Sequence, residues 1–272
     1  MAFILIGAFF SKESVPPRKA DDRHIMVYGH KIRYRDTGGD KPALVFLHSF
    51  GENLEMWDPI TKRLDGFRVI ALDMIGFGGS DRPFLEYNLE TAERYLLGFF
   101  DALGLRKAVL IGSSMGGSIA VWTAGNLGGE RVGALVLFAP SGFPGSLQHR
   151  FPLNHFYRPG PWNTLGRRIV NTPLFQRVFP DSLARQGLGM TGSYNRSYRD
   201  ILKNITQPAL LVWSRGDRRV LYKFADEYMK SMPNVRLVEY PDEAGHGVAH
   251  HQPVRTVEHI TQFLDMNRLA FR

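Results

Sequence analysis

Short apolar runs alternate with segments of helical spacing along this chain, and this alternation restricts the fold more than any other feature. The runs at 43–47 and 134–138 are apolar throughout, whereas a strand with one face in solvent would alternate apolar and polar residues. Strands that are apolar on both faces, separated by helices, form a mostly parallel sheet with helices on both sides. We therefore predict an α/β protein with a twisted, mostly parallel sheet.

The predicted elements occupy most of the chain after residue 23. Its 272 residues, 44% of them hydrophobic, are enough to bury the core of one large domain. We divide the chain into an N-terminal extension (1–23), a core (24–140 and 199–272) and an insertion (141–198). We expect strands at 24–28, 32–35, 43–47, 68–72, 107–111, 134–138, 209–213 and 235–240, and helices at 56–64, 89–103, 117–127, 222–229 and 254–266.

Cysteine is absent, which excludes disulfides, thiolate metal sites and a cysteine nucleophile. No apolar run reaches the roughly 18–20 residues that a membrane span needs. The apolar run Phe3–Phe10 has no Lys or Arg before it and no A-x-A cleavage pattern after it. We expect a cytoplasmic protein without a membrane span, and a signal peptide or an N-terminal anchor stays open.

The segment Gly112–Gly116 matches G-x-S-x-G, a motif that places a nucleophilic serine on a sharp turn between a strand and a helix. The context agrees, because an apolar run precedes the motif and a helix-forming segment follows it. Ser114 would project its hydroxyl above the sheet, and a Cβ at Gly112 or Gly116 would crowd the chain reversal. Neither G-x-x-x-x-G-K-S/T nor a clean G-x-G-x-x-G fits this segment, which disfavours a phosphate-binding loop.

A nucleophilic serine needs a base, and the base needs an orienting carboxylate. His246 follows the last predicted strand and Asp217 follows the strand before it, so both fall at the edge of the sheet where Ser114 lies. The chain order Ser, Asp, His is the order that this motif predicts. We expect Ser114, Asp217 and His246 to be catalytic, and Asp242 and Glu243 are alternative acids because they lie close to His246 in sequence.

His246 and His250 have the spacing of two metal ligands on a helix. The chain lacks H-E-x-x-H, however, and Gly245 and Gly247 favour a loop at this place. We therefore expect no metal and no cofactor.

Three motifs together resemble the α/β-hydrolase superfamily, in its branch of epoxide-hydrolase-like proteins and esterases. The resemblance covers roughly residues 24–140 and 199–268, and it implies the α/β-hydrolase fold with a small inserted cap. Epoxide hydrolases and haloalkane dehalogenases carry Asp where this chain has Ser114, so neither activity is expected. The motifs are His48-Ser49-Phe50-Gly51, Asp73-x-x-Gly76-x-Gly78-x-Ser80 and Gly112-x-Ser114-x-Gly116.

Members of this family stabilise the oxyanion of a tetrahedral intermediate with two backbone N–H groups, which the resemblance assigns to Phe50 and Met115. The chain departs from the family at Ser49, where Gly is usual. If that position requires a positive φ, Ser49 strains the loop. We also expect six side chains to contact the substrate: His48, Ser49, Ser113, Phe143, Trp162 and Val248.

The resemblance implies a serine esterase that acts on a small-molecule ester through an acyl-enzyme, and carboxylesterase is the first expectation. Thioester hydrolysis and C–C bond hydrolysis of the meta-cleavage type are alternatives. C–C hydrolases often have Asn in place of Ser113 and an aromatic residue soon after the catalytic His, where this chain has Gly247 and Val248. A non-catalytic receptor on the same fold is a distant alternative, because such proteins commonly lose a triad residue. Assembly into a homo-oligomer stays open.

The net charge of +8 comes mostly from one segment, since residues 141–200 contain eight arginines, no lysine and two acids. No run of five or more Lys and Arg occurs, so we expect no nucleic-acid partner. Family members place a cap over the nucleophile at this position. The segment predicts either a packed lid with solvated arginines or an entrance that attracts substrates with a carboxylate, for which Arg167 and Arg168 are candidates.

Overall fold

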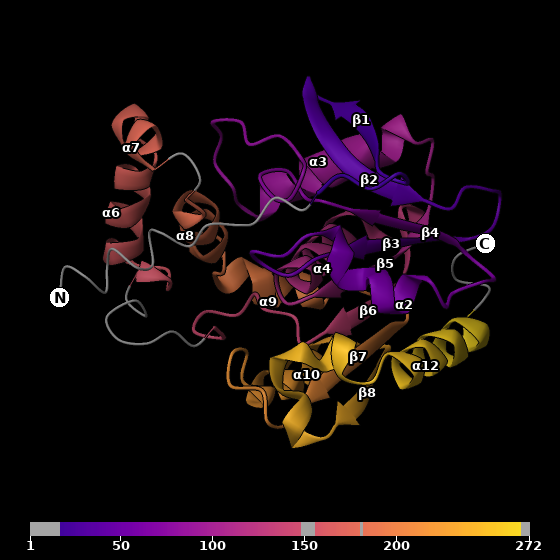
Figure 1. The fold of residues 1–272 in the computed structure, drawn as a ribbon. Coiled ribbons are helices and arrows are strands. Elements are labelled where there is room, and N and C mark those ends of the chain that lie inside the picture. The colour runs from indigo at the N-terminus through magenta and orange to yellow at the C-terminus, as the bar shows by residue number, and fades with distance from the viewer. Residues whose placement is uncertain (1–16, 148–155, 180–181, 268–272) are drawn as a thin grey trace.

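The computed structural model describes residues 17–147, 156–179 and 182–267. Most of the expected N-terminal extension and part of the predicted insertion therefore lie outside the described residues. Helices flank a central sheet in the described chain (Figure 1). No helix among these residues has the length and apolar character needed to cross a bilayer.

The sheet has eight strands in the order β1-β2-β4-β3-β5-β6-β7-β8. β2 pairs antiparallel with β1 and with β4, and every other neighbouring pair is parallel, which confirms the predicted sheet. The central strands are buried along their whole length, which explains why they are apolar throughout. The strands are β1 (Arg23–Val27), β2 (His30–Asp36), β3 (Ala43–Leu47), β4 (Arg68–Leu72), β5 (Ala108–Ser113), β6 (Val132–Phe138), β7 (Ala209–Ser214) and β8 (Val235–Tyr240).

Helices cover both faces of this sheet. α3 (Leu89–Ala102) and α4 (Met115–Leu127) pack together behind the strands in Figure 1, whereas α2 (Asp58–Thr61) and α12 (Pro253–Met266) pack together in front of them. η3 (Tyr222–Phe224) and α10 (Ala225–Ser231) lie between β7 and β8 in the chain, where one helix was predicted. The short elements η2 (Gly128–Glu130), η4 (Asp242–Gly247) and α11 (Val248–His251) complete the core.

α3 shows how the sequence specifies one of these helices. The Asn88 side chain caps its start by accepting a hydrogen bond from the backbone N–H of Thr91 at 2.8 Å. Its end is marked by Gly104, whose φ of +66° a residue with a Cβ rarely adopts. The side chains that recur at helical spacing form its buried face: Leu89, Ala92, Tyr95, Leu96, Phe99 and Phe100.

Segment 56–64 forms two short helices in place of the single predicted one. The 3-10 helix η1 (Leu54–Trp57) ends where α2 begins, and Pro59 lies in the first turn of α2. Proline has no N–H to bond to the preceding turn, so the chain starts a new helix there. The prediction of a continuous helix was therefore wrong, although Ile60 and Leu64, two of the apolar residues spaced four apart that suggested it, are buried.

The segment between β6 and β7 contains α6 (Pro161–Val170), α7 (Pro173–Val178), α8 (Ala184–Gly192) and α9 (Arg196–Leu202). Figure 1 shows α6 and α7 beyond one end of the sheet, with α8 between them and the core. α8 approaches the core closely, because a Cβ on Gly189 would lie 2.2 Å from the carbonyl oxygen of Tyr87. The closeness of this contact fixes where α8 lies above the sheet.

The Asp73–Ser80 motif has a structural role in this fold. Asp73 is fully buried and accepts hydrogen bonds from the backbone N–H groups of Leu54 and Gly79, both at 2.7 Å, and from Arg33 at 3.0 Å. Ser80 donates to the carbonyl oxygen of Asp73 at 2.7 Å. The motif therefore holds the loop after β4 against η1, beside the end of β3.

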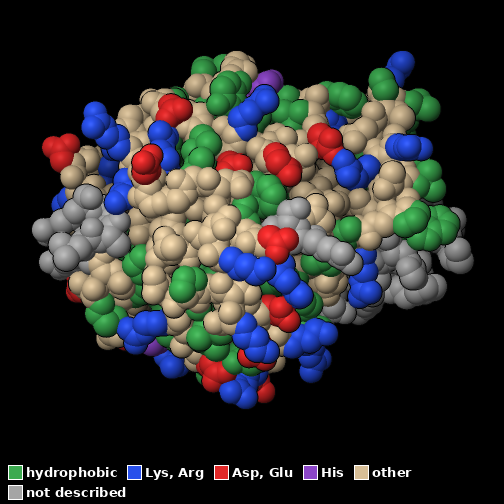
Figure 2. Space-filling view, turned by 180° about the vertical axis from the view of Figure 1, so that it is seen from behind, with side chains coloured by type: hydrophobic (Ala, Val, Ile, Leu, Met, Phe, Trp, Pro, Cys, Tyr) green, Lys and Arg blue, Asp and Glu red, His purple; other side chains and the backbone are tan. Residues whose placement is uncertain are grey.

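The surface seen from behind carries mixed charge. Figure 2 shows Lys and Arg side chains lying among Asp and Glu side chains over the described part of that face. Positive charge is therefore interspersed there with negative charge.

Candidate active site

Ser114 connects β5 to α4 at a strained backbone position. Its φ and ψ are 51° and −109°, in a region that residues with a Cβ rarely adopt. Three backbone hydrogen bonds hold the turn: its N–H donates to Phe138, and its carbonyl accepts from Ser118 and Ser141, at 2.9–3.1 Å. The position matches the sharp turn that G-x-S-x-G predicts, with Ser114 at the carboxyl end of a central strand.

Glycine is required on both sides of this turn. A Cβ on Gly112 would lie 2.4 Å from the carbonyl carbon and oxygen of Gly116. A Cβ on Gly116 would lie 2.1 Å from the carbonyl oxygen of Leu47 at the end of β3. The expected crowding is present, and the absence of both side chains lets α4 begin directly against the neighbouring strands.

His246 is held by Asp217. The Nδ1 atom of His246 lies 2.7 Å from Oδ2 of Asp217, and the other carboxylate oxygen accepts from the backbone N–H groups of Arg219 and Val220 at 2.8 and 2.9 Å. Because an ionised carboxylate only accepts, Nδ1 is the protonated nitrogen of the neutral tautomer, in which Nε2 has a free lone pair. Asp242, the alternative acid, is exposed in η4. The geometry thus pairs the histidine with the expected acid.

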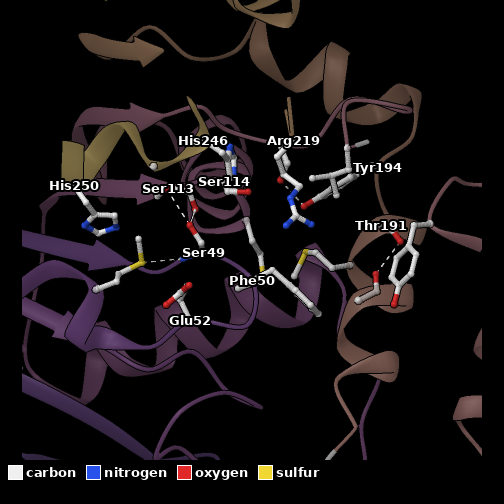
Figure 3. Close-up of a pocket in the computed structure, with 18 of the residues that line it drawn as sticks. Ser49, Phe50, Glu52, Ser113, Ser114, Thr191, Tyr194, Arg219, His246 and His250 are labelled. Carbon is white, nitrogen blue, oxygen red and sulfur yellow. Dashed lines mark hydrogen bonds between the residues drawn. The ribbon is translucent and has the colours of Figure 1, made fainter. Parts of the chain in front are cut away.

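A cavity of about 760 Å³ contains Ser114 and His246. Figure 3 shows the His246 ring beside Ser114, with α8 residues across the cavity. The two side chains form no hydrogen bond with each other in the described structure, and such bonds often tighten only when substrate binds. The lining residues are Ser49, Phe50, Glu52, Glu55, Met56, Pro59, Ser113, Ser114, Met115, Ser141, Leu147, Tyr157, Gly187, Met190, Thr191, Tyr194, Arg219, His246, Gly247 and His250.

Phe50 and Met115 are the two residues to which the resemblance assigns the oxyanion hole. Met115 is the first residue of α4, and the first N–H groups of a helix have no acceptor within the helix. Phe50 follows β3 in the adjacent loop, and its ring packs edge-on against Phe77 at 5.6 Å. Both Phe50 and Met115 line the cavity beside Ser114. This placement is compatible with the oxyanion hole that the resemblance implies.

The departure at Ser49 introduces no backbone strain. Ser49 is not among the residues with positive φ, and Gly51 supplies the left-handed position of the loop with a φ of +74°. The Ser49 hydroxyl donates to the Ser113 hydroxyl at 3.0 Å. The loop that carries Phe50 is therefore tied to the strand that ends at the nucleophile.

Four residues expected to contact substrate do not line the cavity. His48 is fully buried, where its Nδ1 donates to the Ser49 carbonyl at 2.8 Å and its Nε2 accepts from the Met74 N–H at 3.0 Å. Burial lowers the pKa of His48, so the ring is neutral and supports the loop. Three others also lie outside the cavity lining: Phe143, packed against the rings of Tyr198, Phe224 and Tyr228; Val248, fully buried; and Trp162, exposed on α6.

Several lining residues were not singled out from the sequence. Tyr194 is buried and bonds to Ser141 at 2.8 Å, and burial raises the pKa of its hydroxyl. Glu52 lies at the opposite side of the cavity, and burial also raises the pKa of its carboxyl. Nothing in their local sequence marks these residues, because packing of the insertion on the core brings them together. Within the described residues, no three His, Asp or Glu side chains are arranged as metal ligands.

Comparisons with known proteins show the family and the fold. A family model described as "Alpha/beta hydrolase family" matches residues 44–259. The chain is 30% identical over 236 residues, 76% of this chain and 82% of the other, to a 2-hydroxy-6-oxononadienedioate/2-hydroxy-6-oxononatrienedioate hydrolase of Paraburkholderia phymatum.

Solved structures resemble the described fold as well. A meta-cleavage product hydrolase of Pseudomonas fluorescens IP01 matches with a TM-score of 0.72 at 22% identity, covering 90% of this chain and 97% of that one. An enol-lactonase of Burkholderia xenovorans LB400 matches with a TM-score of 0.72 at 23% identity, covering 89% of this chain and all (100%) of that one. These two likenesses concern the fold.

Proposed function

Since the chain belongs to the alpha/beta hydrolase family, we propose that it is a serine hydrolase that cleaves carboxylic esters through an acyl-enzyme. Ser114 is the nucleophile, His246 the general base and Asp217 the residue that orients the base. One observation carries the proposal: a serine on a strained strand-to-helix turn shares a cavity with a histidine whose Nδ1 is held 2.7 Å from a buried carboxylate.

In the first half of the reaction, Nε2 of His246 takes the proton of Ser114 while Oγ attacks the ester carbonyl carbon. Electrons of the C=O bond move to its oxygen, and the N–H groups of Phe50 and Met115 stabilise that oxyanion. One such donor is typically worth about 3–4 kcal/mol of barrier. Collapse of the intermediate breaks the ester C–O bond, and His246 returns its proton to the leaving alcohol.

Water completes the reaction in the second half. His246 takes a proton from water, the resulting hydroxide attacks the acyl carbon, and the same N–H groups hold the second oxyanion. Collapse breaks the bond to Ser114, whose oxygen regains a proton from His246. Asp217 remains ionised and stabilises the imidazolium in each half.

Residues 141–198 act in this proposal as a cap over Ser114. Support comes from the cavity lining, to which this segment contributes seven residues: Ser141, Leu147, Tyr157, Gly187, Met190, Thr191 and Tyr194. Such a cover excludes bulk water and presents an apolar wall to the acyl or alcohol group.

Hydrolysis of a C–C bond is the second candidate. The relative of 30% identity is named as a hydrolase of 2-hydroxy-6-oxononadienedioate, and this name favours the alternative. The chain departs from that group at Ser113 and at Gly247-Val248, and Ser113 and Gly247 line the cavity. The same serine, base and oxyanion donors would serve either reaction.

A substrate panel separates the two reactions. Aryl esters of graded acyl length are compared with a 2-hydroxy-6-oxo-dienedioate, and kcat/KM is measured for the parent protein and for Ser114→Ala. We expect the parent to hydrolyse an ester with the higher kcat/KM and the variant to lose that activity. A higher kcat/KM for the dienedioate than for every ester would assign C–C hydrolysis instead.

A further inference from the structure

Arg219 is the one Lys or Arg among the described residues that line the cavity. Figure 3 shows its side chain directed into the cavity between Tyr194 and the catalytic pair Ser114 and His246. Most of the lining is apolar or uncharged, so the solvent-exposed guanidinium of Arg219 is the one Lys or Arg charge that this lining offers to a ligand. Its five donors in a planar fork match the geometry of a carboxylate.

The Asp217 carboxylate, which orients His246, also holds the backbone of Arg219. Oδ1 of Asp217 accepts from the N–H groups of Arg219 and Val220 at 2.8 and 2.9 Å. Val220 is fully buried, and its carbonyl accepts from the Trp213 indole at 3.1 Å. The guanidinium therefore extends from a backbone segment that is held in place. The Asp217 carboxylate positions both this segment and His246.

No acid of the described chain pairs with the Arg219 guanidinium. Two carboxylates line the cavity besides it. Glu55 is held by Arg33 and Arg35, the latter at 2.6 Å. Glu52 forms no ion pair with Arg219 in the described structure. Arg219 thus places an uncompensated positive charge beside the nucleophile.

The arginines of the insertion whose side chains the structure describes do not line the cavity. Arg167 pairs with Glu86, and neither Arg167 nor Arg168 lines the cavity. Of the two alternatives for this segment, the carboxylate-attracting entrance therefore gains no support from the positions of Arg167 and Arg168. The cation that reaches the cavity comes from the loop after β7.

We infer that Arg219 binds a carboxylate of the substrate, so that the preferred substrates are esters carrying a second, anionic group. This inference rests on the proposed ester hydrolysis and adds the substrate class. Arg219 would receive the carboxylate in a charge-assisted hydrogen bond, while the scissile carbonyl lies at Ser114. Arg219 is then a specificity-determining residue.

Two matched substrate pairs test the inference. The first compares the 4-nitrophenyl monoester of adipate with 4-nitrophenyl hexanoate, which places the charge on the acyl side. The second compares 3-carboxyphenyl hexanoate with phenyl hexanoate, which places it on the alcohol side. We expect the anionic member of one pair to have the higher kcat/KM at low ionic strength, and we expect this preference to shrink with added salt.

Three variants identify the residue responsible. Arg219→Gln should lower the anionic-to-neutral ratio of kcat/KM about 10- to 100-fold, mainly through the KM of the anionic ester. Arg219→Glu should invert the preference. Arg218→Gln is the matched control, because Arg218 is exposed as Arg219 is but does not line the cavity, and it should leave the ratio unchanged.

Each outcome decides one of the two proposals. Hydrolysis of neutral esters without a preference in either pair, or a preference that survives in Arg219→Gln, overturns the role of Arg219 and leaves ester hydrolysis standing. Failure of the folded parent to hydrolyse any of the four esters overturns the proposed function itself.

Discussion

The hydroxyl of Ser49 lies 3.0 Å from the hydroxyl of Ser113, and this bond joins the loop after β3 to the last residue of β5. Phe50, one of the two proposed oxyanion donors, follows Ser49 directly, and Ser114 follows Ser113. The pair therefore sets the distance between donor and nucleophile.

Removal of either hydroxyl should slow catalysis while leaving substrate binding nearly intact. Ser49→Ala and Ser113→Ala should each lower kcat about 3- to 10-fold, since one neutral hydrogen bond contributes about 1 kcal/mol. The double variant should be no slower than either single variant, because both changes delete the same bond. Steady-state kinetics on an aryl ester measure this, and multiplicative effects in the double variant would contradict it.

Asp217 should be essential and Asp242 dispensable. Asp217→Asn replaces the acceptor that holds His246 in the tautomer with Nε2 free, so kcat should fall about 10⁴-fold. Asp242→Asn is the control, because that side chain is exposed in the same region, and kcat should change less than about 3-fold. Circular dichroism confirms folding of both variants. A large loss in Asp242→Asn with a small one in Asp217→Asn would reassign the acid.

Stability should decrease on mild acidification. Burial lowers the pKa of His48, and burial lowers those of His24, His250 and His259 as well. Below about pH 6.5 the unfolded chain takes up protons that the folded chain does not, so the free energy of unfolding decreases as the pH is lowered. Thermal denaturation should give a lower Tm at pH 5.5 than at pH 7.5.

A variant assigns part of this effect to one ring. His48→Gln removes the titrating group while keeping an acceptor for the Met74 N–H, so its Tm should be lower at pH 7.5 but should fall less between pH 7.5 and 5.5. A parent Tm that is constant or higher at pH 5.5 would contradict the account.

The central strands and the strand-to-helix turn at Ser114 could be predicted from the sequence because their determinants are local. The apolar run Ala43–Leu47 and the motif Gly112–Gly116 each specify backbone conformation through a few neighbouring residues, and the structure places both as predicted. The helix predicted at 56–64 was divided because Pro59 ends hydrogen bonding to the preceding turn.

The part of the cavity lining formed by the segment between β6 and β7 and by the loop after β7 could not be predicted from the sequence. α6 buries only Asn163, Gly166 and Val170, so its hydrophobic pattern does not predict a helix that packs on a core. Tyr194 and Arg219 meet near Ser114 only because the segment between β6 and β7 folds back over the loop after β7. His48 differs from the expectation in another way. A histidine beside a functional loop was expected to contact substrate, whereas this one is buried and supports the loop through a hydrogen bond to the Met74 N–H.

The most direct measurement of the central claim is covalent labelling of the parent protein and of Ser114→Ala with a fluorophosphonate, with the site located by peptide mass spectrometry. Ser114 is the serine at the strained turn that shares a cavity with the His246–Asp217 pair. The account predicts one phosphonylated serine, Ser114, in the parent, and no labelling and no ester hydrolysis in the folded variant. Labelling that persists in Ser114→Ala, or that falls on Ser49 or Ser113 in the parent, would contradict it.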